Sequence, residues 1–368
     1  MPSALKSELI LGIETSCDET AAAVLRGPRQ VLSNVVATQV PVHRRYGGVV
    51  PELASRQHIL AIDAVIQEAL DKAGVSLRDL GGIAVTYGPG LVGSLLVGLS
   101  AAKAMAMVLD LPLAAVNHHE GHIHSLFIEH DDIPLPGIIL MVSGGDTSLY
   151  VMEKRGEVRP LAHTRDDAAG EAYDKVAKLL GLGYPGGPII DRLAKRGNPK
   201  AVPFSRPRMS DGTLDFSFSG LKTAVLRHVQ AHRLKESASP GALVPGAGGS
   251  STAAAGGGPE ATAEASEAVL DLLASFQEVL VSYLVDHAVK AARLHTARSI
   301  GLSGGVACNS RLRAAMREAG DRLGIPVFYP SPPLTTDNAA MIAAAGWHHL
   351  AAGRTASLTL NADPSARL

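Results

Sequence analysis

The sequence predicts an α/β fold with two domains, and three observations support that class. The chain has 368 residues, which is long enough for two domains of ordinary size, each with its own core. It is 46% hydrophobic but only 4% aromatic, and it contains 38 glycines and 22 prolines. This composition is typical of an α/β enzyme rich in small residues and turns, not of a disordered chain. Strand-like apolar runs and helical periodicity occur in both halves of the chain.

The first half contains strand-like and helix-like segments in alternation. Residues 9–16 form an apolar run that ends at a polar turn, and residues 21–40 predict a hairpin with its turn at Gly27 and Pro28. Residues 54–74 carry apolar side chains at helical spacing. Three more segments follow, namely a strand meeting a glycine-rich turn at 82–90, a small-residue helix at 91–111, and a strand running into a helix at 113–130.

The pattern restarts near residue 135. A strand, a Gly-Gly turn and a strand are again predicted at 136–153, so the chain has either two duplicated α/β domains or two unrelated hairpins. A low-complexity segment at about 236–260 is interpreted as a flexible Ala/Gly insertion, because it cannot bury enough surface to offset its ordering entropy. A long amphipathic helix at about 261–295 precedes a strand, turn and helix at 298–320 and a strand, loop and helix at 327–353. We therefore divide the chain into residues 1–134, residues 135–350 and a tail at 351–368.

The charge of the chain limits how it can hold nucleic acid. Its formal net charge is −1 and its pI is near 6.9, which is no electrostatic footprint for RNA or DNA. An RNA partner must therefore be held by a local basic patch or by another protein. One candidate patch is a basic rim whose members could equally be scattered, solvated side chains: Lys195, Arg196, Arg206, Arg208 and Lys222.

Cysteine content and hydropathy indicate a cytoplasmic protein without a membrane span. Cys17 and Cys308 lie far apart in sequence and make no disulfide framework, which favours a reducing cytosol. The first residues pass from a short polar leader into an apolar run, without the basic region or the cleavage site of a secretory signal. The most apolar long stretch, residues 89–116, contains Lys103 and Asp110, so a buried helix and strand explain it better than a span.

A histidine pair at residues 118 and 122 has the spacing of a metal site. On a helix the two side chains lie on one face, about 6 Å apart along the axis. Neutral imidazoles suit zinc, iron or nickel, although such a pair also occurs by coincidence in a core or on a surface. His119 points elsewhere. The HExxH motif is absent, because the segment from His119 to His122 is one residue short, and a metalloprotease centre is excluded on that ground.

Three Gly-Gly turns follow apolar strands, at Gly144–Gly145, Gly186–Gly187 and Gly304–Gly305. Glycine lets backbone amides approach a phosphate or ribose closely, and a helix start adds unpaired N–H groups. A single turn of this kind is usually just a turn, but three in one chain indicate nucleotide binding. Neither a Walker A motif nor GxGxxG is present.

Several carboxylates could act in binding, and each has a structural alternative. Glu171 and Asp174 lie one helical turn apart, either as acids that complement a helix dipole or as ligands of ribose hydroxyls. Asp337 is either a helix cap or the oxygen ligand that completes a site of two histidines and one aspartate. The other acidic candidates are Glu14, Asp18, Glu19, Asp166, Asp167 and Asp191.

Taken together, nine strings resemble one family. They occur in the order GIETSCDET, GGVVPELASRQH, GPGLVGSLLVG, NHHEGH, VSGGDT, DDAAGEAYDKVAKLLGLGYPGGP, FSFSGLKT, SGGVACN and TDNAAMIA. From Leu9 to about Gly346 the chain resembles the tRNA N6-adenosine threonylcarbamoyltransferases, called TsaD in bacteria. The resemblance implies an actin-like ATPase (ASKHA, sugar-kinase-like) fold, with two duplicated α/β domains around a central cleft. Two departures are Asp146, where the family often has His or Asn, and the long Ala/Gly insertion.

The resemblance also implies a site, residue by residue. One divalent metal, expected to be Fe²⁺ with Zn²⁺ as the alternative, would be held by His118, His122 and Asp337. Glu14 and Asp18 would lie on the phosphate side of the cleft. The threonylcarbamoyladenylate would contact a larger set, comprising Met141, Val142, Ser143, Gly144, Gly145, Asp174, Gly187, Asp191 and Asn309.

The implied reaction moves the threonylcarbamoyl group from its adenylate to N6 of the adenosine beside the anticodon, in tRNAs that read codons beginning with A. The implied partners are tRNA, a smaller paralogous subunit of the same fold (TsaB-like) and a small ATPase (TsaE-like). An ATP-dependent kinase or ATPase of the same superfold is the main alternative. The histidine pair argues against it, because such enzymes need only Mg²⁺ held by carboxylates and water. A non-enzymatic scaffold subunit is a further alternative, and the complete ligand set argues against that one.

Overall fold

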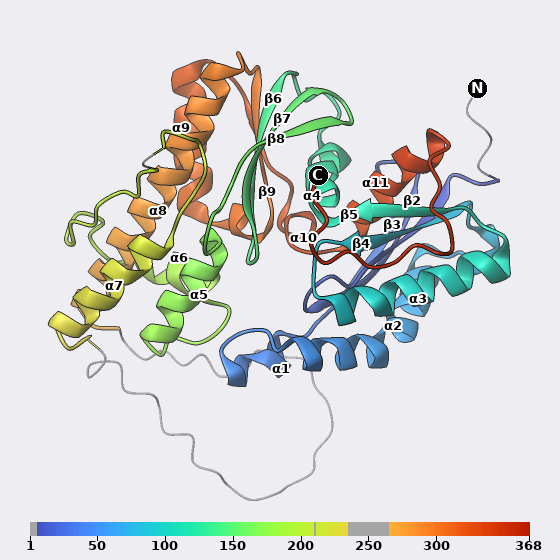
Figure 1. The fold of residues 1–368 in the computed structure, drawn as a ribbon, viewed down its shortest axis with the longest axis horizontal. Helices are drawn as coiled ribbons and strands as arrows, with labels where there is room; N and C mark the ends of the chain where they lie inside the picture. Colours follow the sequence, from blue (N-terminus) through green and yellow to red (C-terminus); the bar gives the residue numbers. More distant parts are fainter. Residues whose placement is uncertain (1–5, 210, 235–264) are drawn as a thin grey trace, which may run out of the picture.

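The computed structural model describes residues 6–209, 211–234 and 265–368, which form two lobes lying side by side (Figure 1). Each lobe is built on a five-stranded sheet with helices packed against it. The insertion predicted at about 236–260 lies outside the described residues.

The first sheet has the strand order β3-β2-β1-β4-β5. The central strand β1 is fully buried and pairs antiparallel with β2 and parallel with β4. The predicted hairpin is confirmed, since β2 and β3 pair antiparallel on either side of the turn at Gly27 and Pro28. The strand bounds are β1 Leu9–Glu14, β2 Glu19–Arg26, β3 Gln30–Thr38, β4 Gly82–Gly88 and β5 Leu113–Asn117.

The second sheet repeats the topology of the first. Its order is β10-β9-β6-β7-β8, with β6 pairing antiparallel with β7 and parallel with β9. The pairs β7–β8 and β9–β10 also match β2–β3 and β4–β5 in direction. The strand bounds are β6 Gly137–Val142, β7 Thr147–Lys154, β8 Glu157–His163, β9 Ser299–Ser303 and β10 Val327–Phe328. An identical order with identical directions supports duplication over two unrelated hairpins.

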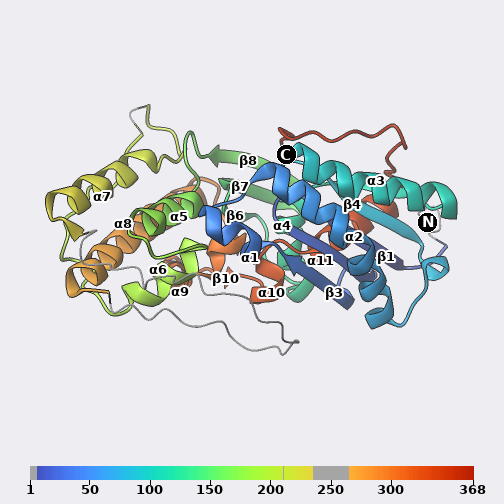
Figure 2. The ribbon, with the colours of Figure 1, turned by 90° about the horizontal axis from the view of Figure 1, so that it is seen from below.

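Each sheet has a helical layer on its outer face (Figures 1 and 2). In the first lobe α2 and α3 bury apolar side chains such as Ile62 and Leu99 against the sheet. In the second lobe the layer is formed mainly by α5, α7, α8 and α9, and its core includes Phe276 and Leu284. The helix bounds are α1 Val40–His43, η1 Arg44–Tyr46, α2 Pro51–Ala73, η2 Leu77–Asp79, α3 Val92–Leu109, α4 His118–Glu129, α5 Ala169–Leu179, α6 Gly186–Ala194, α7 Ser219–Ala231, α8 Glu267–Leu294, η4 Gly305–Cys308, α9 Ser310–Leu323, α10 Pro332–Thr335 and α11 Ala339–Ala351.

Two helices lie between the sheets, and each packs on the sheet of the other half. Helix α4 follows β5 of the first sheet, yet its Ile123 and Leu126 pack against Met141 of the second. Helix α11 follows β10 of the second sheet, yet its Ala343 packs against Ile10 of the first. Figure 1 shows both helices in the middle of the molecule. A division at residue 135 stays a proposal, and the packing shows that the two halves exchange a helix.

The C-terminal tail lies along the first lobe (Figure 1). Its backbone amides at Ala356 and Asp363 donate to the carbonyl groups of Leu113 and Tyr87. The Lys103 ammonium of α3 donates to the Leu360 carbonyl at 2.9 Å. The tail therefore covers the helix α3 side of β4 and β5, and it reaches the mouth of the cleft between the lobes at Pro364.

Among the described residues, α3 and α8 are long and apolar enough to cross a membrane by length and composition. Within α8, 72% of the most apolar window is buried inside the protein, as in a core helix. Helix α3 buries Leu95, Leu99 and Ala102 against its neighbours and leaves Met107 and Val108 exposed. Both helices are therefore part of the packed fold, as predicted for residues 89–116.

Candidate metal centre and nucleotide cleft

The first turn of α4 presents two histidines on one face. Asn117 caps the helix, with its side-chain oxygen accepting a hydrogen bond from the backbone N–H of His119 at 2.9 Å. The cap fixes the start of the helix, so that His118 and His122 fall one turn apart with their ring centroids 4.7 Å from each other. His122 is fully buried and His118 nearly so.

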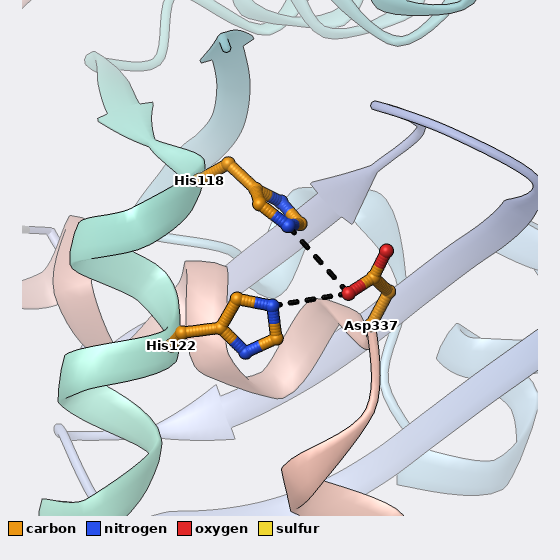
Figure 3. Close-up of side chains that lie close together, drawn as sticks. All are labelled: His118, His122 and Asp337. Atoms are coloured by element: carbon orange, nitrogen blue, oxygen red, sulfur yellow. Dashed lines mark hydrogen bonds and ion pairs between the residues drawn. The ribbon is translucent and has the colours of Figure 1, made fainter. Parts of the chain in front are cut away.

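Asp337 completes the group from the other end of the chain (Figure 3). Its Oδ1 lies 3.0 Å from Nε2 of His122 and 3.5 Å from Nε2 of His118. One ligand atom from each of the three side chains falls within 4.8 Å of the others. The capping role left open for Asp337 belongs instead to Asn338, which accepts from the Met341 N–H at 3.1 Å. The Asp337 carboxylate is therefore available to face the histidines.

Glu14, at the end of β1, orients His118 from behind. Its Oε2 lies 3.0 Å from Nδ1 of His118 and accepts from the Thr86 hydroxyl at 2.6 Å. The Ser16 hydroxyl lies 3.1 Å from the same imidazole nitrogen. A carboxylate on Nδ1 directs Nε2 toward Asp337, which is the arrangement that holds metal-ligating histidines in place.

The carboxylates around His118 and the burial of the group act in opposite directions on its pKa values. Burial acts to lower the pKa of His118, but the carboxylates of Glu14 and Asp337 hold it well above its usual value. Burial acts to raise the pKa of Glu14 and Asp337, yet His118 holds both below their usual values. Both nitrogens of His118 thus face carboxylates, and positive charge stabilises the cluster. Two imidazoles and one carboxylate are a donor set that suits iron or zinc, so the residues fit the implied metal.

Further carboxylates surround the group. Asp18 and Glu19 line the same cleft as Asp337. Burial, together with Asp18 and Asp337, raises the pKa of Glu19 to about 10. Glu19 is therefore neutral at pH 7, whereas the ionised Asp337 would repel an anionic ligand unless a cation lay between them.

A cleft of about 960 Å³ opens above the histidines, between the lobes. Its volume is that of a pocket for a nucleotide-sized ligand. It is lined by most of the residues that the sequence singled out, namely Asp18, His118, Ser143, Gly144, Gly145, Asp174, Gly187, Asp191, Asn309 and Asp337. The candidate metal centre and the glycine turns therefore share one cavity.

The glycine turns are open toward this cleft. A Cβ added at Gly144, Gly145 or Gly187 would meet no atom within 4 Å, so a ligand can approach these backbones. Close packing lies behind them instead, where a Cβ on Gly170 would come within 2.5 Å of the Ser143 carbonyl oxygen. At the third turn Gly304 has φ +83° and lies over the Val142 carbonyl, a position that excludes other residues.

Three predicted residues do not present their side chains to the cleft. Met141 and Val142 are fully buried within β6, where they pack on opposite faces of the second sheet. The resemblance implies that both contact the adenylate, whereas in the structure it is the turn after them, Ser143, Gly144 and Gly145, that lines the cleft. His122 lies behind His118 and does not line the cleft either.

Each residue predicted to bind the adenosine and ribose end of the ligand through a polar side chain also makes a hydrogen bond within the protein. Asp174 accepts from the Gly186 N–H at 2.7 Å, and burial raises its pKa to about 6. Asp191 accepts from the Ser310 hydroxyl at 2.9 Å, which ties α6 to α9. Asn309 caps α9 through Leu312 and donates to Gln277 at 2.8 Å. These bonds fix the orientation of the polar groups lining this side of the cleft.

Comparison with known proteins decides the family. A model of the tRNA N6-adenosine threonylcarbamoyltransferases (TsaD) matches residues 30–344. The protein of that name from Clostridium perfringens is 48% identical over 364 residues, 99% of each chain. That from Syntrophotalea carbinolica is 51% identical over 354 residues, 96% of this chain and 95% of its own. The chain belongs to this family.

Solved structures of more distant proteins confirm the predicted actin-like fold. Full-length HypF, solved in a phosphate- and nucleotide-bound form, superposes with a TM-score of 0.57 at 14% identity, covering 97% of this chain and 58% of HypF. The (R)-2-hydroxyglutaryl-CoA dehydratase component A of Acidaminococcus fermentans gives a TM-score of 0.51 at 15% identity, covering 94% of this chain and 100% of its own. At such identities the likeness shows the fold alone.

Within this threonylcarbamoyltransferase fold, sequence reasoning missed two groups at the cleft. The imidazole of His119 lies 3.2 Å from the Tyr150 hydroxyl and 4.0 Å from Asp146, so the wall beside the metal centre is polar. Burial acts to raise the pKa of Asp146 although the Ser148 hydroxyl donates to it. The second missed group is the loop at Gly47 and its neighbours, whose place at the cleft no local pattern indicated.

Proposed function

We propose that this chain is a tRNA N6-adenosine threonylcarbamoyltransferase that moves the threonylcarbamoyl group of its adenylate to N6 of the adenosine beside the anticodon, in tRNAs that read codons beginning with A. One observation carries the proposal. In a chain 48% and 51% identical to two members of the family over nearly its whole length, His118, His122 and Asp337 converge, and His118 and Asp337 line the same cleft as the open glycine backbones.

His118, His122 and Asp337 would hold one divalent metal, and we propose Fe²⁺, with Zn²⁺ as the alternative. When bound, the metal supplies a Lewis acid that polarises oxygens of the substrate and screens their charge from the acidic floor. Glu14 keeps Nδ1 of His118 protonated and Nε2 aimed at the site.

The glycine turns would bind the adenylate. An added Cβ at Gly144, Gly145 or Gly187 would meet no atom within 4 Å, so phosphate and ribose oxygens can approach these backbones closely, although the Gly145 N–H already donates to the Ser143 hydroxyl. Asp174 and Asp191 carry carboxylate oxygens that can accept from ribose hydroxyls, while Asn309 lines the same wall. Because each is already held by a second bond, little ordering is needed when the ligand enters.

The reaction forms a bond between N6 of the adenosine and the carbamoyl carbon, and it breaks the bond from that carbon to the phosphate oxygen. AMP leaves. The exocyclic amine is a weak nucleophile, so the protein's contribution is to position both partners and stabilise negative charge on the leaving group. Direct transfer needs no covalent intermediate on the protein, although the Ser16 hydroxyl, His118 and Asp337 lie in contact at this cleft.

The partners belong to the same proposal. We propose that the chain works in the cytoplasm with tRNA, a smaller TsaB-like subunit of the same fold and a small TsaE-like ATPase. The family name supports tRNA as the substrate. A chain with a net charge of −1 attracts RNA only weakly, which supports a role for partner proteins in tRNA binding.

The test is a transfer assay with purified chain, threonylcarbamoyladenylate and tRNA, run with and without the two partner proteins. We expect AMP and N6-threonylcarbamoyladenosine as products. His118→Ala should lose metal and transfer, whereas His119→Ala, changed at the next residue on the same helix, should keep its metal. Release of ADP from ATP, with no modified nucleoside formed under any condition, would instead favour a kinase or ATPase.

A further inference from the structure

Three of the five residues of the predicted basic rim face carboxylates in the fold, and the other two, Arg196 and Arg208, do not line the cleft. Lys222 donates to Asp167 at 2.6 Å, and Arg206 pairs with Asp286. Lys195, which does line the cleft, lies 3.7 Å from Asp191. Cations that already face carboxylates are poorly placed to neutralise RNA phosphates, so a grip on RNA has to be sought elsewhere.

A short loop at the mouth of the cleft carries unpaired charge. It comprises residues 43–49, with Arg44, Arg45 and Tyr46 in one 3₁₀ turn, and we call it the Arg-Tyr loop. All three side chains are exposed. In the part of the chain that the structure describes, neither guanidinium has a carboxylate within ion-pair distance, and Arg45 lies over the Tyr46 ring at 5.1 Å. The tip therefore combines two positive charges with an aromatic face.

The base of the Arg-Tyr loop is buried and hydrogen-bonded, whereas its tip is exposed to solvent. His43 is fully buried, with Nε2 at 3.1 Å from the Gln39 side-chain oxygen, and its Nδ1 accepts from the Val50 N–H at 3.3 Å. Gly47 follows the turn in the left-handed conformation, with φ +68°. Tyr46 remains 47% exposed, although burying an aromatic ring would be favourable. A fixed base with an exposed aromatic tip, one face of which carries Arg45, indicates a surface for a partner.

The loop faces the other lobe across the cleft. Gly47, Gly48 and Val49 line the cavity that also holds His118 and Asp337. On the far side Lys178 of α5 extends its ammonium to within 3.5 Å of the Tyr46 carbonyl oxygen. In both ribbon views α1 and the turn after it lie beside α5 (Figures 1 and 2). The Arg-Tyr loop and α5 therefore form one part of the rim of the cleft.

From this placement we infer that the Arg-Tyr loop binds the single-stranded RNA next to the reacting adenosine. Tyr46 stacks on a neighbouring nucleobase, and Arg44 and Arg45 contact the flanking phosphates. The inference rests on the proposed function, because it takes the ligand to be a tRNA loop. An adenosine can reach the floor of the cleft only if it leaves the stack of its neighbours, and an aromatic face at the rim replaces the stacking that those neighbours lose.

The first experiment measures binding of tRNA to the full chain at several salt concentrations. Tyr46→Ala should weaken binding by about 5- to 100-fold, and Tyr46→Trp should restore it. Arg44→Ala combined with Arg45→Ala should make the negative slope of log K against log salt shallower by about 1 to 2, as expected for two lost phosphate contacts. Arg26→Ala is the matched control, because Arg26 is an exposed arginine at the end of β2 far from the polar turn, and it should change neither quantity.

The second experiment identifies the stacked base. The affinities of the wild-type chain and of Tyr46→Ala are measured for a complete tRNA anticodon stem-loop and for one that lacks the base next to the target adenosine. If Tyr46 stacks on that base, the losses of binding free energy caused by the missing base and by Tyr46→Ala are not additive, since either change removes the same contact. In transfer assays the KM for tRNA should rise while kcat and adenylate binding stay unchanged. Additive losses with both neighbouring bases would overturn the stacking assignment.

The outcomes separate this inference from the proposed function. Normal tRNA affinity and KM in Tyr46→Ala and in the double arginine variant, with transfer intact, would overturn the inference alone. Absence of any transfer by the wild-type chain with its partners would overturn the proposed function. Loss of a protein partner's binding with unchanged tRNA affinity would show that the Arg-Tyr loop is a protein contact, and would also overturn the inference.

Discussion

The two lobes repeat one sheet topology, but the turns of their leading hairpins differ in kind. In the first lobe, the turn from Glu14 to Asp18 carries carboxylates that are buried, one of them bonded to His118 and Thr86. In the second lobe, the matching turn holds Gly144 and Gly145, which are exposed and free of nearby side chains. The same position in the duplicated fold thus supplies a carboxylate against His118 in one lobe, and in the other two exposed glycines followed by one carboxylate, Asp146.

This difference shows how a duplicated fold can divide one task. The first-lobe turn orients a histidine for a cation, while the second-lobe turn leaves room for a nucleotide. The metal ligands lie on helix α4 and just before helix α11, and the exchange of these two helices brings the ligands together between the lobes. Variants in the first-lobe turn and its metal ligands can therefore be compared with variants beside the second-lobe turn.

The largest effect should come from the metal ligands themselves. Asp337→Ala removes the carboxylate that both imidazoles face, so we expect loss of bound metal and a fall in transfer rate of roughly 100- to 1000-fold. Metal content by elemental analysis and single-turnover transfer check this. Circular dichroism should show an intact fold. Full transfer by a metal-free Asp337→Ala, His118→Ala double variant would contradict the metal proposal.

A smaller effect should follow from changing the first-lobe turn behind the ligands. Glu14→Gln keeps the shape of the side chain but removes the charge that orients Nδ1 of His118, so metal affinity should fall by about 10- to 100-fold. Competition with a chelator measures it. Thr86→Val, which removes only the hydroxyl bond to Glu14, should lie between this variant and the wild type. Unchanged affinity in Glu14→Gln would mean that the first-lobe turn plays no part in the metal site.

The second-lobe turn can be displaced without touching its glycines. A Cβ on Gly170 would lie 2.5 Å from the Ser143 oxygen and 2.7 Å from the Gly144 Cα, so Gly170→Ala should push the turn and weaken adenylate binding about tenfold. Gly220→Ala is the matched control, since Gly220 also occupies the second position of a helix and would meet no atom within 4 Å. Calorimetric titration distinguishes the two. Equal affinities in both variants would show that the turn does not hold the adenylate.

The smallest effect concerns pH. Burial raises the pKa of Asp174 to about 6, so its carboxylate ionises as the pH rises through that value. If the ionised form accepts from ribose hydroxyls, adenosine affinity should increase about fourfold from pH 5.5 to 7. Asp174→Asn should bind more weakly at pH 7 and show no such rise. A rise in affinity that persists in Asp174→Asn would assign the titration to another group.

The same shift has a consequence for folding. Because the folded pKa of Asp174 lies above its unfolded value, the stability it contributes is present below the unfolded pKa and is lost as the pH rises through about 6. Asp174→Asn should therefore be at least as stable as the wild type at pH 7. Denaturant unfolding at pH 5 and pH 7 measures the difference, and a variant less stable at pH 7 than at pH 5 relative to the wild type would reverse the sign.

The sequence by itself determined the local elements and the family. Apolar runs gave the strands and hairpins in both halves, since a buried strand must be apolar along its length. The spacing of His118 and His122 placed both on one helical face, and the ordered motifs pointed to the threonylcarbamoyltransferases. Spacing alone left Asp337 between a cap and a ligand, and it could not show that Met141 and Val142 are buried in β6.

Only the tertiary structure decided which residues from distant parts of the chain lie in contact. Asp337 lies 215 residues from His122, and no local rule brings them together, whereas the exchange of α4 and α11 between the sheets does. The same packing placed Glu14 behind His118, neutralised Lys222 and Arg206, and set the Arg-Tyr loop opposite α5. Hydrophobic periodicity records how each segment is buried, but charges and ligands act over distances that depend on how distant segments pack.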